Sequence, residues 1–278
     1  MAQAPLITLA NVTAYLNSSG VVYPSSSNPL FQRLIGAVST FAGVYLSRPI
    51  APQTFTETYN GNGRYVLTLR QQPVIVVHSV TVSTTAIAAR PMANQAGYVN
   101  DDASVSICGG HRFCYGRQNV TIVYDAGYLT SDVAFVPSTP AVSTGLYAVD
   151  TNTLSRPWNS AFGGVTYSST GSAFTLVTTA PTLAGTYQLT TDALGNTSYV
   201  FAAADAGAAI TIVYGYTPED IAQALLELVC ERFKARNRIG EMSQNIGQGQ
   251  VVAFSQLSMG NAVRELLNQY RNVVPIES

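Results

Sequence analysis

Residues 119–128, NVTIVYDAGY, and residues 208–216, AAITIVYGY, are two similar stretches that decide how this chain is organised. Each contains β-branched and aromatic side chains around a shared TIVY sequence, which predicts a buried strand. The second stretch repeats the end of the first after a long intervening segment. A module inserted just after residue 128 would return the chain to the place that it left, so we predict an insertion.

The segment between the two stretches differs in composition from the rest of the chain. Residues 118–216 hold five acidic residues and one basic residue, Arg156, whereas residues 217–278 hold seven acidic and six basic residues. Short strand-like pieces alternate with turn residues, as in small all-β domains. These pieces are GLYAVD, AFTLVTTA, GTYQLTT, TSYVFAAAD and AAITIVYGY. We therefore expect residues 130–215 to form an inserted β-domain of the sandwich or barrel type.

Two helices are predicted at the start of the chain. Thr8 is a candidate N-cap, followed by apolar residues at helical spacing. In the second helix, Asn28 is the candidate cap, Pro29 suits the first helical position, and Pro49 marks the end. The apolar residues expected on the buried faces are Leu9, Val12 and Leu16, then Leu30, Phe31, Leu34, Ile35, Val38, Phe41 and Tyr45.

The end of the chain is predicted to be helical as well. Thr217 and Pro218 open a helix that ends at Gly240. Its expected buried face contains Ile221, Leu225, Leu228, Val229 and Phe233. A Gly, Gln and Ser stretch at 240–250 predicts a flexible loop, VVAFS a strand, and NAVRELLNQYRN a last helix.

Between these helical regions the sequence predicts a sheet. Asn60-Gly61 is a turn signal, residues 65–69 alternate, and residues 74–82 form a β-branched run. SVSIC, RFCYG and NVTIVYDAGY follow as short strands around Gly109-Gly110. The fold class is therefore α+β: a helical domain with a β-hairpin or small sheet region, formed by residues 1–129 and 216–278, with the β-domain inserted.

The composition limits the possible functions. Of 278 residues, 47% are hydrophobic and 10% are charged, and the net charge is -1 with Lys234 as the single lysine. The low charge indicates a polar β-rich surface, a surface covered by neighbouring subunits, or both. A near-neutral chain lacks the long-range positive field that holds DNA. We expect no secretion signal, no membrane span and reduced thiols, which together favour the cytosol.

One cluster has the residue types of a metal site. CGGHRFC places Cys108, His111 and Cys114 within seven residues, but a zinc site needs a fourth ligand, and none is apparent. We favour a turn between strands over a metal site or a Cys108–Cys114 disulfide. Cys230 is expected to be a small core residue.

Other motifs favour structural roles. Arg232, Lys234, Arg236 and Arg238 alternate with acidic residues at a helix end, which favours a solvated face that complements the helix dipole over a DNA contact. The glycines of NGNGR and CGG fit turns and do not fit a phosphate loop. No acid, base and nucleophile can be placed together from spacing alone, so we expect no catalytic residues, no cofactor and no enzyme.

Four passages resemble the head-to-tail connector (adaptor) family of tailed double-stranded DNA bacteriophages. They are LITLANVTAYL with the long helix after it, ETYNGNGRYVLTLRQQPVIVVHSV, NVTIVYDAGY, and PEDIAQALLELVCERFKARNRIGE leading to VRELLNQYRNVV. The resemblance implies a structural virion protein, assembled in the host cytoplasm, that forms a homo-oligomeric ring, commonly of twelve copies, at the head-tail junction. It implies a portal protein on one side, tail-side proteins (stopper, tail terminator, tail tube or nozzle) on the other, and passage of DNA through the channel without sequence-specific binding.

In that family the strand ending in Y-x-A-G-Y runs almost directly into the helix that here begins at Pro218, so residues 130–215 depart from the pattern. The apolar end of the chain suits an arm that becomes ordered on a partner, and we assign it to the portal. Its residues are Tyr270, Arg271, Asn272, Val273, Val274, Pro275 and Ile276.

Two other functions are considered. The Tyr-rich strands of the insert could bind a glycan or decorate the capsid or tail, because tyrosine gives contact area at low entropic cost, although ordinary sheet packing explains them as well. A hydrolase with dispersed catalytic carboxylates ranks last, since no sequence feature identifies which acidic residues would be catalytic.

Overall fold

The chain has an α+β fold. The computed structural model describes all residues except 1–3, 21, 93–94, 143, 152–153, 159–161, 237–242, 246–250, 254–258 and 272–278. The chain divides into two compact units. Of the described residues, those within 4–46, 191–196 and 217–271 form the helical unit, and those within 47–190 and 197–216 form the β unit. No helix among the described residues is both long and apolar enough to cross a bilayer.

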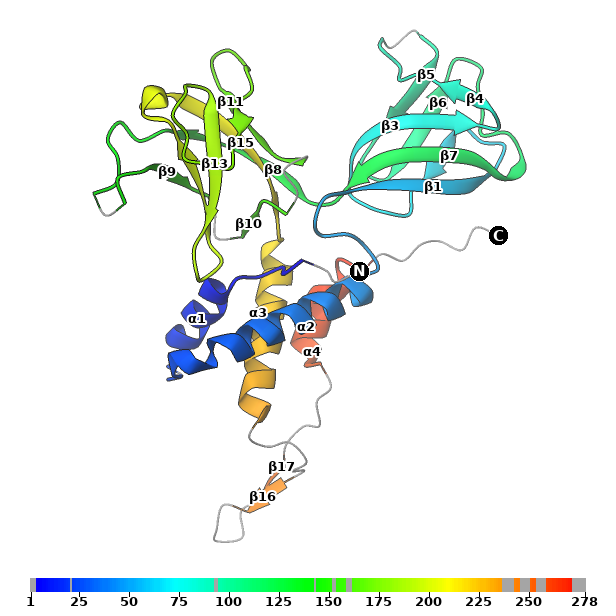
Figure 1. Ribbon diagram of the computed structural model, residues 1–278. Helices are drawn as coiled ribbons and strands as arrows, with labels where there is room; N and C mark the ends of the chain where they lie inside the picture. The colour runs from blue at the N-terminus through cyan, green and yellow to red at the C-terminus, as the bar shows by residue number, and fades with distance from the viewer. Residues whose placement is uncertain are drawn as a thin grey trace. The chain divides into compact units, whose positions relative to one another are not determined.

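The helical unit consists of α1 (Leu9–Ser18), a short 3-10 turn (Ser25–Ser27), α2 (Asn28–Leu46), α3 (Glu219–Ala235) and α4 (Asn261–Asn268). Thr8 caps α1 as predicted: its side chain accepts from the Asn11 N–H at 3.0 Å, and the Asn11 side chain accepts from the Thr8 N–H at 3.0 Å. Figure 1 shows the four helices packed across one another.

The two other predicted N-caps are wrong. Asn28 is itself the first residue of α2 and follows directly on the 3-10 turn, and its Oδ1 is buried without a partner among the described residues. Pro218 occupies the cap of α3. The Thr217 hydroxyl instead donates to the Leu6 carbonyl at 2.7 Å, which ties the start of α3 to the N-terminal segment.

The predicted buried face of α3 is confirmed. Ile221, Leu225, Leu228, Val229 and Phe233 are all buried, together with Cys230. The face of α2 is confirmed in part: Phe31, Ile35 and Val38 are buried, whereas Leu30, Leu34, Phe41 and Tyr45 are half-buried. The ring centroids of Phe31 and Phe233 lie 4.5 Å apart, so aromatic packing joins α2 to α3.

The predicted loop at 240–250 contains a strand. β16 (Ser243–Asn245) pairs with β17 (Val251–Ala253), the latter within the predicted VVAFS strand. The pairing of two short antiparallel segments supplies backbone partners that composition alone does not reveal. The predicted end of α3 at Gly240 is wrong, because the helix already ends at Ala235. Gly240, Arg238 and residues 246–250 lie outside the described residues.

The first lobe of the β unit is built from two sheets that enclose one apolar core. One sheet has the order β1-β7-β3-β4 and the other β2-β6-β5. The strands are β1 (Gln53–Gly61), β2 (Val66–Thr68), β3 (Val74–Val82), β4 (Thr85–Ile87), β5 (Gly97–Asn100), β6 (Ser104–Cys108) and β7 (Gly116–Ala126). Figure 1 shows β7 between β1 and β3, and each pairs with it antiparallel.

Two local predictions in this lobe are wrong. Asn60-Gly61 is not the turn: β1 continues to Gly61, which pairs with Gly116, and the chain turns after it. The Asn62 side chain accepts from the Arg64 N–H at 2.9 Å and so makes that turn. RFCYG forms no strand before Gly116, where β7 begins.

The second lobe also has two sheets around a core of its own. In one sheet β15 pairs with β8 along one edge and with β10 and β11 along the other; the second sheet has the order β12-β13-β14-β9. The strands are β8 (Leu129–Phe135), β9 (Tyr147–Asp150), β10 (Ser155–Arg156), β11 (Gly164–Tyr167), β12 (Thr175–Leu176), β13 (Thr186–Thr191), β14 (Thr197–Phe201) and β15 (Ala209–Tyr216), and a 3-10 turn spans Ala203–Asp205.

The tip of the β13–β14 hairpin belongs to the helical unit. The Ala10 N–H donates to the Leu194 carbonyl at 3.0 Å, and Gly195, with φ +86°, lies against Thr8. Asp192 holds the tip in shape by accepting from the Leu194 and Asn196 N–H groups. This contact with α1 could not be predicted, because the residues of a turn do not determine which distant segment it contacts.

Candidate functional site

The beginning of the predicted portal arm lies on the helical unit. The Tyr270 hydroxyl donates to Asp220 Oδ2 at 3.2 Å, and the Arg271 guanidinium lies 5.5 Å from the centroid of the Tyr45 ring. The Tyr45 hydroxyl donates to Asn268 Oδ1 at 2.7 Å. These contacts join the end of α4 to α2 and α3. The other predicted arm residues, Asn272, Val273, Val274, Pro275 and Ile276, lie outside the described residues.

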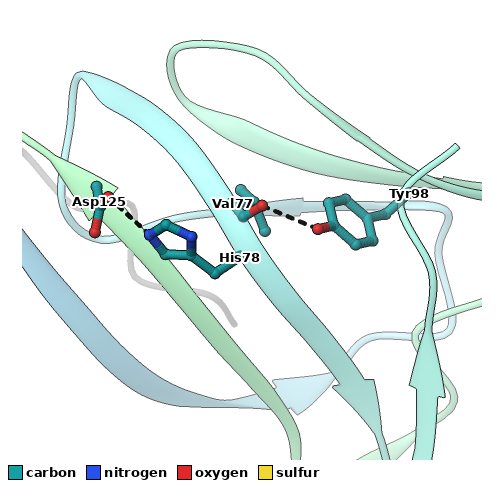
Figure 2. Close-up of polar contacts among 4 residues, drawn as sticks. All are labelled: Val77, His78, Tyr98 and Asp125. Carbon is teal, nitrogen blue, oxygen red and sulfur yellow. Dashed lines mark hydrogen bonds and ion pairs between the residues drawn. The ribbon is translucent and has the colours of Figure 1, made fainter. Parts of the chain in front are cut away.

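The first β lobe contains an acid-base pair that spacing could not reveal. His78 Nε2 lies 2.7 Å from Asp125 Oδ2, across β3 and β7 (Figure 2). The His78 side chain is 48% exposed and that of Asp125 is 9% exposed, so a solvated ring covers an almost buried carboxylate. Asp125 Oδ1 is buried and has no partner among the described residues. The imidazole is therefore the side chain that stabilises this carboxylate.

A register irregularity in the sheet brings the pair together. The pairing of β3 with β7 shifts between Val77 and Ser79, so His78 is the extra residue of a bulge. At this bulge the buried Tyr98 hydroxyl donates to the Val77 carbonyl at 2.9 Å (Figure 2). Burial raises the pKa of the Tyr98 hydroxyl, which therefore remains a donor. The bulge is thus fixed from the core side by Tyr98.

A His-Asp pair can serve as an oriented base, but nucleophilic catalysis also needs a nucleophile within hydrogen-bond reach of the imidazole. Among the described residues, the one side-chain partner of His78 is Asp125. The geometry is that of a structural pair at a bulge.

Tyrosine hydroxyls bind several of the few carboxylates of the β unit. The Tyr59 and Tyr124 hydroxyls both donate to Glu57 Oε2, the latter at 2.8 Å. Burial, followed by the bond to Glu57, raises the pKa of Tyr59 above its usual range, and burial does the same for Tyr124. The Arg70 and Gln71 N–H groups donate to these two hydroxyls. The network therefore holds the loop after β2 on the core and leaves no reactive group free.

Two similar contacts occur in the second lobe. The Tyr167 hydroxyl bonds the buried Asp205, which raises the pKa of Tyr167 to about 12, and Asp205 also accepts from the Gly185 N–H. The Tyr214 hydroxyl donates to Asp132, and burial together with that bond raises the pKa of Tyr214 above its usual range.

The insert's tyrosines mostly pack inward. Tyr187, Tyr199 and Tyr214 are buried in the core, and the rings of Tyr187 and Tyr199 stack with centroids 5.9 Å apart. Tyr147, Tyr167 and Tyr216 are partly buried against that core. Ordinary sheet packing thus explains these tyrosines.

The CGGHRFC segment is a turn with free thiols. Gly109 and Gly110 have φ values of +81° and +90°, which L side chains rarely adopt. Cys108, Cys114 and Cys230 are all free, and Cys108 Sγ accepts from Arg90 at 3.5 Å. Among the described residues, no three His, Cys, Asp or Glu side chains gather in a way that could hold a metal ion.

Two basic residues at the end of α3 contact neighbouring side chains or carbonyls of the helical unit. Arg236 donates to the Phe233 carbonyl at 2.7 Å and lies over the Phe233 ring, and Arg232 lies 5.9 Å from the Phe41 ring centroid. Donation to a C-terminal carbonyl is the expected role of a base at a helix end. Lys234 is exposed.

Comparisons with known proteins give distant matches. No family model matches the chain, and no curated protein is similar to it. A chain from the neck of an empty gene transfer agent particle, computed with C6 symmetry, matches with a TM-score of 0.46 and 12% identity over 100% of this chain and 95% of that chain. A chain from the virion of a native gene transfer agent particle matches with a TM-score of 0.43 and 11% identity over 98% and 93%.

Proposed function

We propose that this chain is a head-tail connector subunit of a tailed, phage-like particle. It forms a ring, of twelve copies, between the portal and the tail-side proteins and leaves a central channel for DNA. In this proposal the chain acts through its shape and contacts and catalyses no reaction.

The observation that carries the proposal is how the four connector-like passages fold. The first and the last pack together in the helical unit, where Leu6 links Ser39 of α2 and Thr217 before α3 through two hydrogen bonds. The second and third pass through one sheet, in which β7 lies between β1 and β3. Passages far apart in the sequence thus form two joint structures, as expected if they descend from one connector domain.

The division into residues 1–129 and 216–278 as connector domain and 130–215 as inserted β-domain is part of the proposal. It is supported by the two separate apolar cores of the β unit, one of which ends at Ala126 and the other of which begins at Val136. β8 and β15, the strands at the two ends of the insert, pair with each other, so the insert leaves and returns at one place.

The outer face of α2 suits contact with a neighbouring copy. In its 19 residues the helix has one charged side chain, Arg33, and Val44 is 76% exposed. Closed rings need heterologous contacts, in which one patch meets a different patch of the next copy. Because Arg33 is the one charge on this face, little charge needs to be desolvated when the face is buried in such a contact.

The net charge of -1 is compatible with DNA passage, since a conduit must not hold the duplex strongly. The C-terminal arm is assigned to the portal. Its first two residues, Tyr270 and Arg271, are held on the helical unit by contacts with Asp220 and Tyr45.

The test is the native mass of this chain mixed with the portal encoded beside it, compared with each component alone. We expect the portal ring to gain close to a dozen copies of the 29.5 kDa chain. A chain truncated after Arg271 keeps the Tyr270 and Arg271 contacts and should fold normally but lose portal binding. No association of the full chain over a range of salt concentrations would overturn the proposal, and equal binding of the truncated chain would overturn the arm assignment.

A further inference from the structure

One end of the first β lobe carries an unusual concentration of positive charge. Arg64, Arg112 and Arg117 are all exposed there, as is His111. No acidic residue occurs at positions 58–100 or 103–124, the segments that form this end and the strands leading from it. The chain as a whole has 14 basic residues and a net charge of -1, so the positive charge at this end of the lobe is not apparent from the net charge. We call Arg64, Tyr65, Arg112, Tyr115 and Arg117 the arginine tip.

The tip has a fixed backbone. The Gly63 N–H donates to the Phe113 carbonyl at 2.6 Å, and the Phe113 N–H donates to the Arg64 carbonyl at 3.0 Å. The Phe113 side chain is fully buried and anchors the loop in the core. Asn119 closes the arrangement, since it accepts from the Gly61 N–H and donates to the Cys114 carbonyl, each at 2.8 Å. The loop that carries the arginines is therefore held by backbone hydrogen bonds and by a buried side chain.

Two tyrosines lie among the arginines. The exposed Arg112 guanidinium lies 4.6 Å from the Tyr65 ring centroid, and this contact orients it. Tyr115 is 85% exposed and lies against Gly63: a Cβ on Gly63, whose φ is +72°, would come within 2.4 Å of the Tyr115 ring. The glycine thus makes room for an aromatic ring that remains largely open to solvent.

We propose that the arginine tip binds the phosphodiester backbone of nucleic acid. Guanidinium groups pair with phosphate oxygens in a bidentate manner, and an exposed aromatic ring can stack on an unpaired base. An acidic peptide would use the guanidiniums but would leave Tyr115 without a stacking partner. With three arginines and little net charge, the contact is short-ranged, weak per copy and sensitive to salt. This inference does not depend on the connector assignment.

The test is binding of the full chain to labelled single-stranded and duplex DNA, followed by fluorescence anisotropy at several salt concentrations from about 20 mM upward, where exposed charges are least screened. If three phosphates are contacted, log K should fall with log salt with a slope of about -2.7 for duplex and about -2.1 for a single strand. The double variant R64Q/R117Q should lower the duplex slope to about -0.9 and weaken binding about tenfold or more.

The matched control is R33Q/R264Q, which removes two exposed arginines from helices and should leave binding unchanged. Tyr115→Ala should weaken binding of the single strand and leave duplex binding unchanged, since duplex bases are already stacked. Absence of DNA binding at the lowest salt, or an equal loss in the control, would overturn the proposal. The proposal would also be overturned if polyglutamate at matched charge competed with DNA equally well, because the arginine tip would then bind polyanions in general.

Discussion

At the scale of single residues, the pair formed by His78 and Asp125 supports the sheet at a bulge. The substitution His78→Ala would leave an almost buried carboxylate without its hydrogen-bond partner, so we expect a loss of about 1 kcal/mol of unfolding free energy. The measurement is urea unfolding followed by tyrosine fluorescence. His111→Ala, which removes an exposed imidazole from the same lobe, is the control and should have no measurable effect. Equal stability of H78A and H111A would show that the pair contributes nothing.

Two of the free thiols, Cys114 and Cys230, should react in an order set by their exposure and by the raised pKa of Cys230. Cys114 is exposed, whereas Cys230 is buried in α3, and burial raises the pKa of its thiol to about 11. Because the thiolate is the reactive form, Cys114 should be alkylated rapidly near pH 8 and Cys230 only as the pH approaches 11 or the chain unfolds. The raised pKa also means that Cys230's contribution to stability is complete below pH 9 and is lost as the pH rises through 11. Mass spectrometry of timed alkylation, with Cys114→Ser as control, checks the order of reaction, and urea unfolding at pH 8 and pH 11 checks the loss of stability.

Side-chain contacts between distant residues were the feature of this structure that the sequence predicted least well. The pairing of His78 with Asp125 could not be predicted from the sequence. The bulge in β3 that brings them together lies within a continuous β-branched run, which shows no sign of a register shift. Thr217 fits every local rule for an N-cap, yet its hydroxyl bonds Leu6, 211 positions away. Local rules cannot anticipate a partner supplied by another part of the chain.

At the scale of elements, periodicity worked best where one helix face is buried. The α3 face was fully predicted, since its apolar spacing and its burial follow the same period. The ends of strands were less predictable. β1 continues through the Asn60-Gly61 turn signal because Gly61 pairs with Gly116 of β7. The turn preference of Asn-Gly competes with strand pairing, and in β1 the strand pairing determines the backbone conformation.

The α2–α3 contact should dominate the stability of the helical unit. Phe31 is fully buried and packs on Phe233, so Phe31→Ala should cost about 3–5 kcal/mol through lost burial and a residual cavity. Val44→Ala, on the exposed side of the same helix, should change stability by less than about 0.5 kcal/mol. Denaturation followed by circular dichroism at helical wavelengths distinguishes the two. Similar losses in both variants would mean that the two faces of α2 are not different.

At the scale of the whole molecule, the α+β class and the presence of a β-rich segment followed from composition and pattern, because both are summed over many residues. The participation of residues 191–196 in the helical unit did not follow, since it depends on one hairpin tip meeting α1. The functional assignment likewise depended on the order of several weak segments, and the structure adds that these segments fold in pairs.

If the exposed face of α2 is buried between copies, charges placed on it should prevent ring formation. The double variant A37E/V44E should remain folded, because both side chains are exposed, but should sediment as a monomer in the presence of the portal. Ala262→Glu, on the exposed side of α4, adds a charge elsewhere and serves as the control. Assembly of A37E/V44E at wild-type level would place the contact between copies on another surface.

If this chain is a connector subunit, it lies at the head-tail junction, and its position in the assembled particle can be measured. Particles labelled with gold-conjugated antibody against residues 130–215 and imaged by electron microscopy should carry label at one place, the neck between head and tail. Label spread over the capsid or along the tail would contradict the connector assignment and support the decoration protein instead.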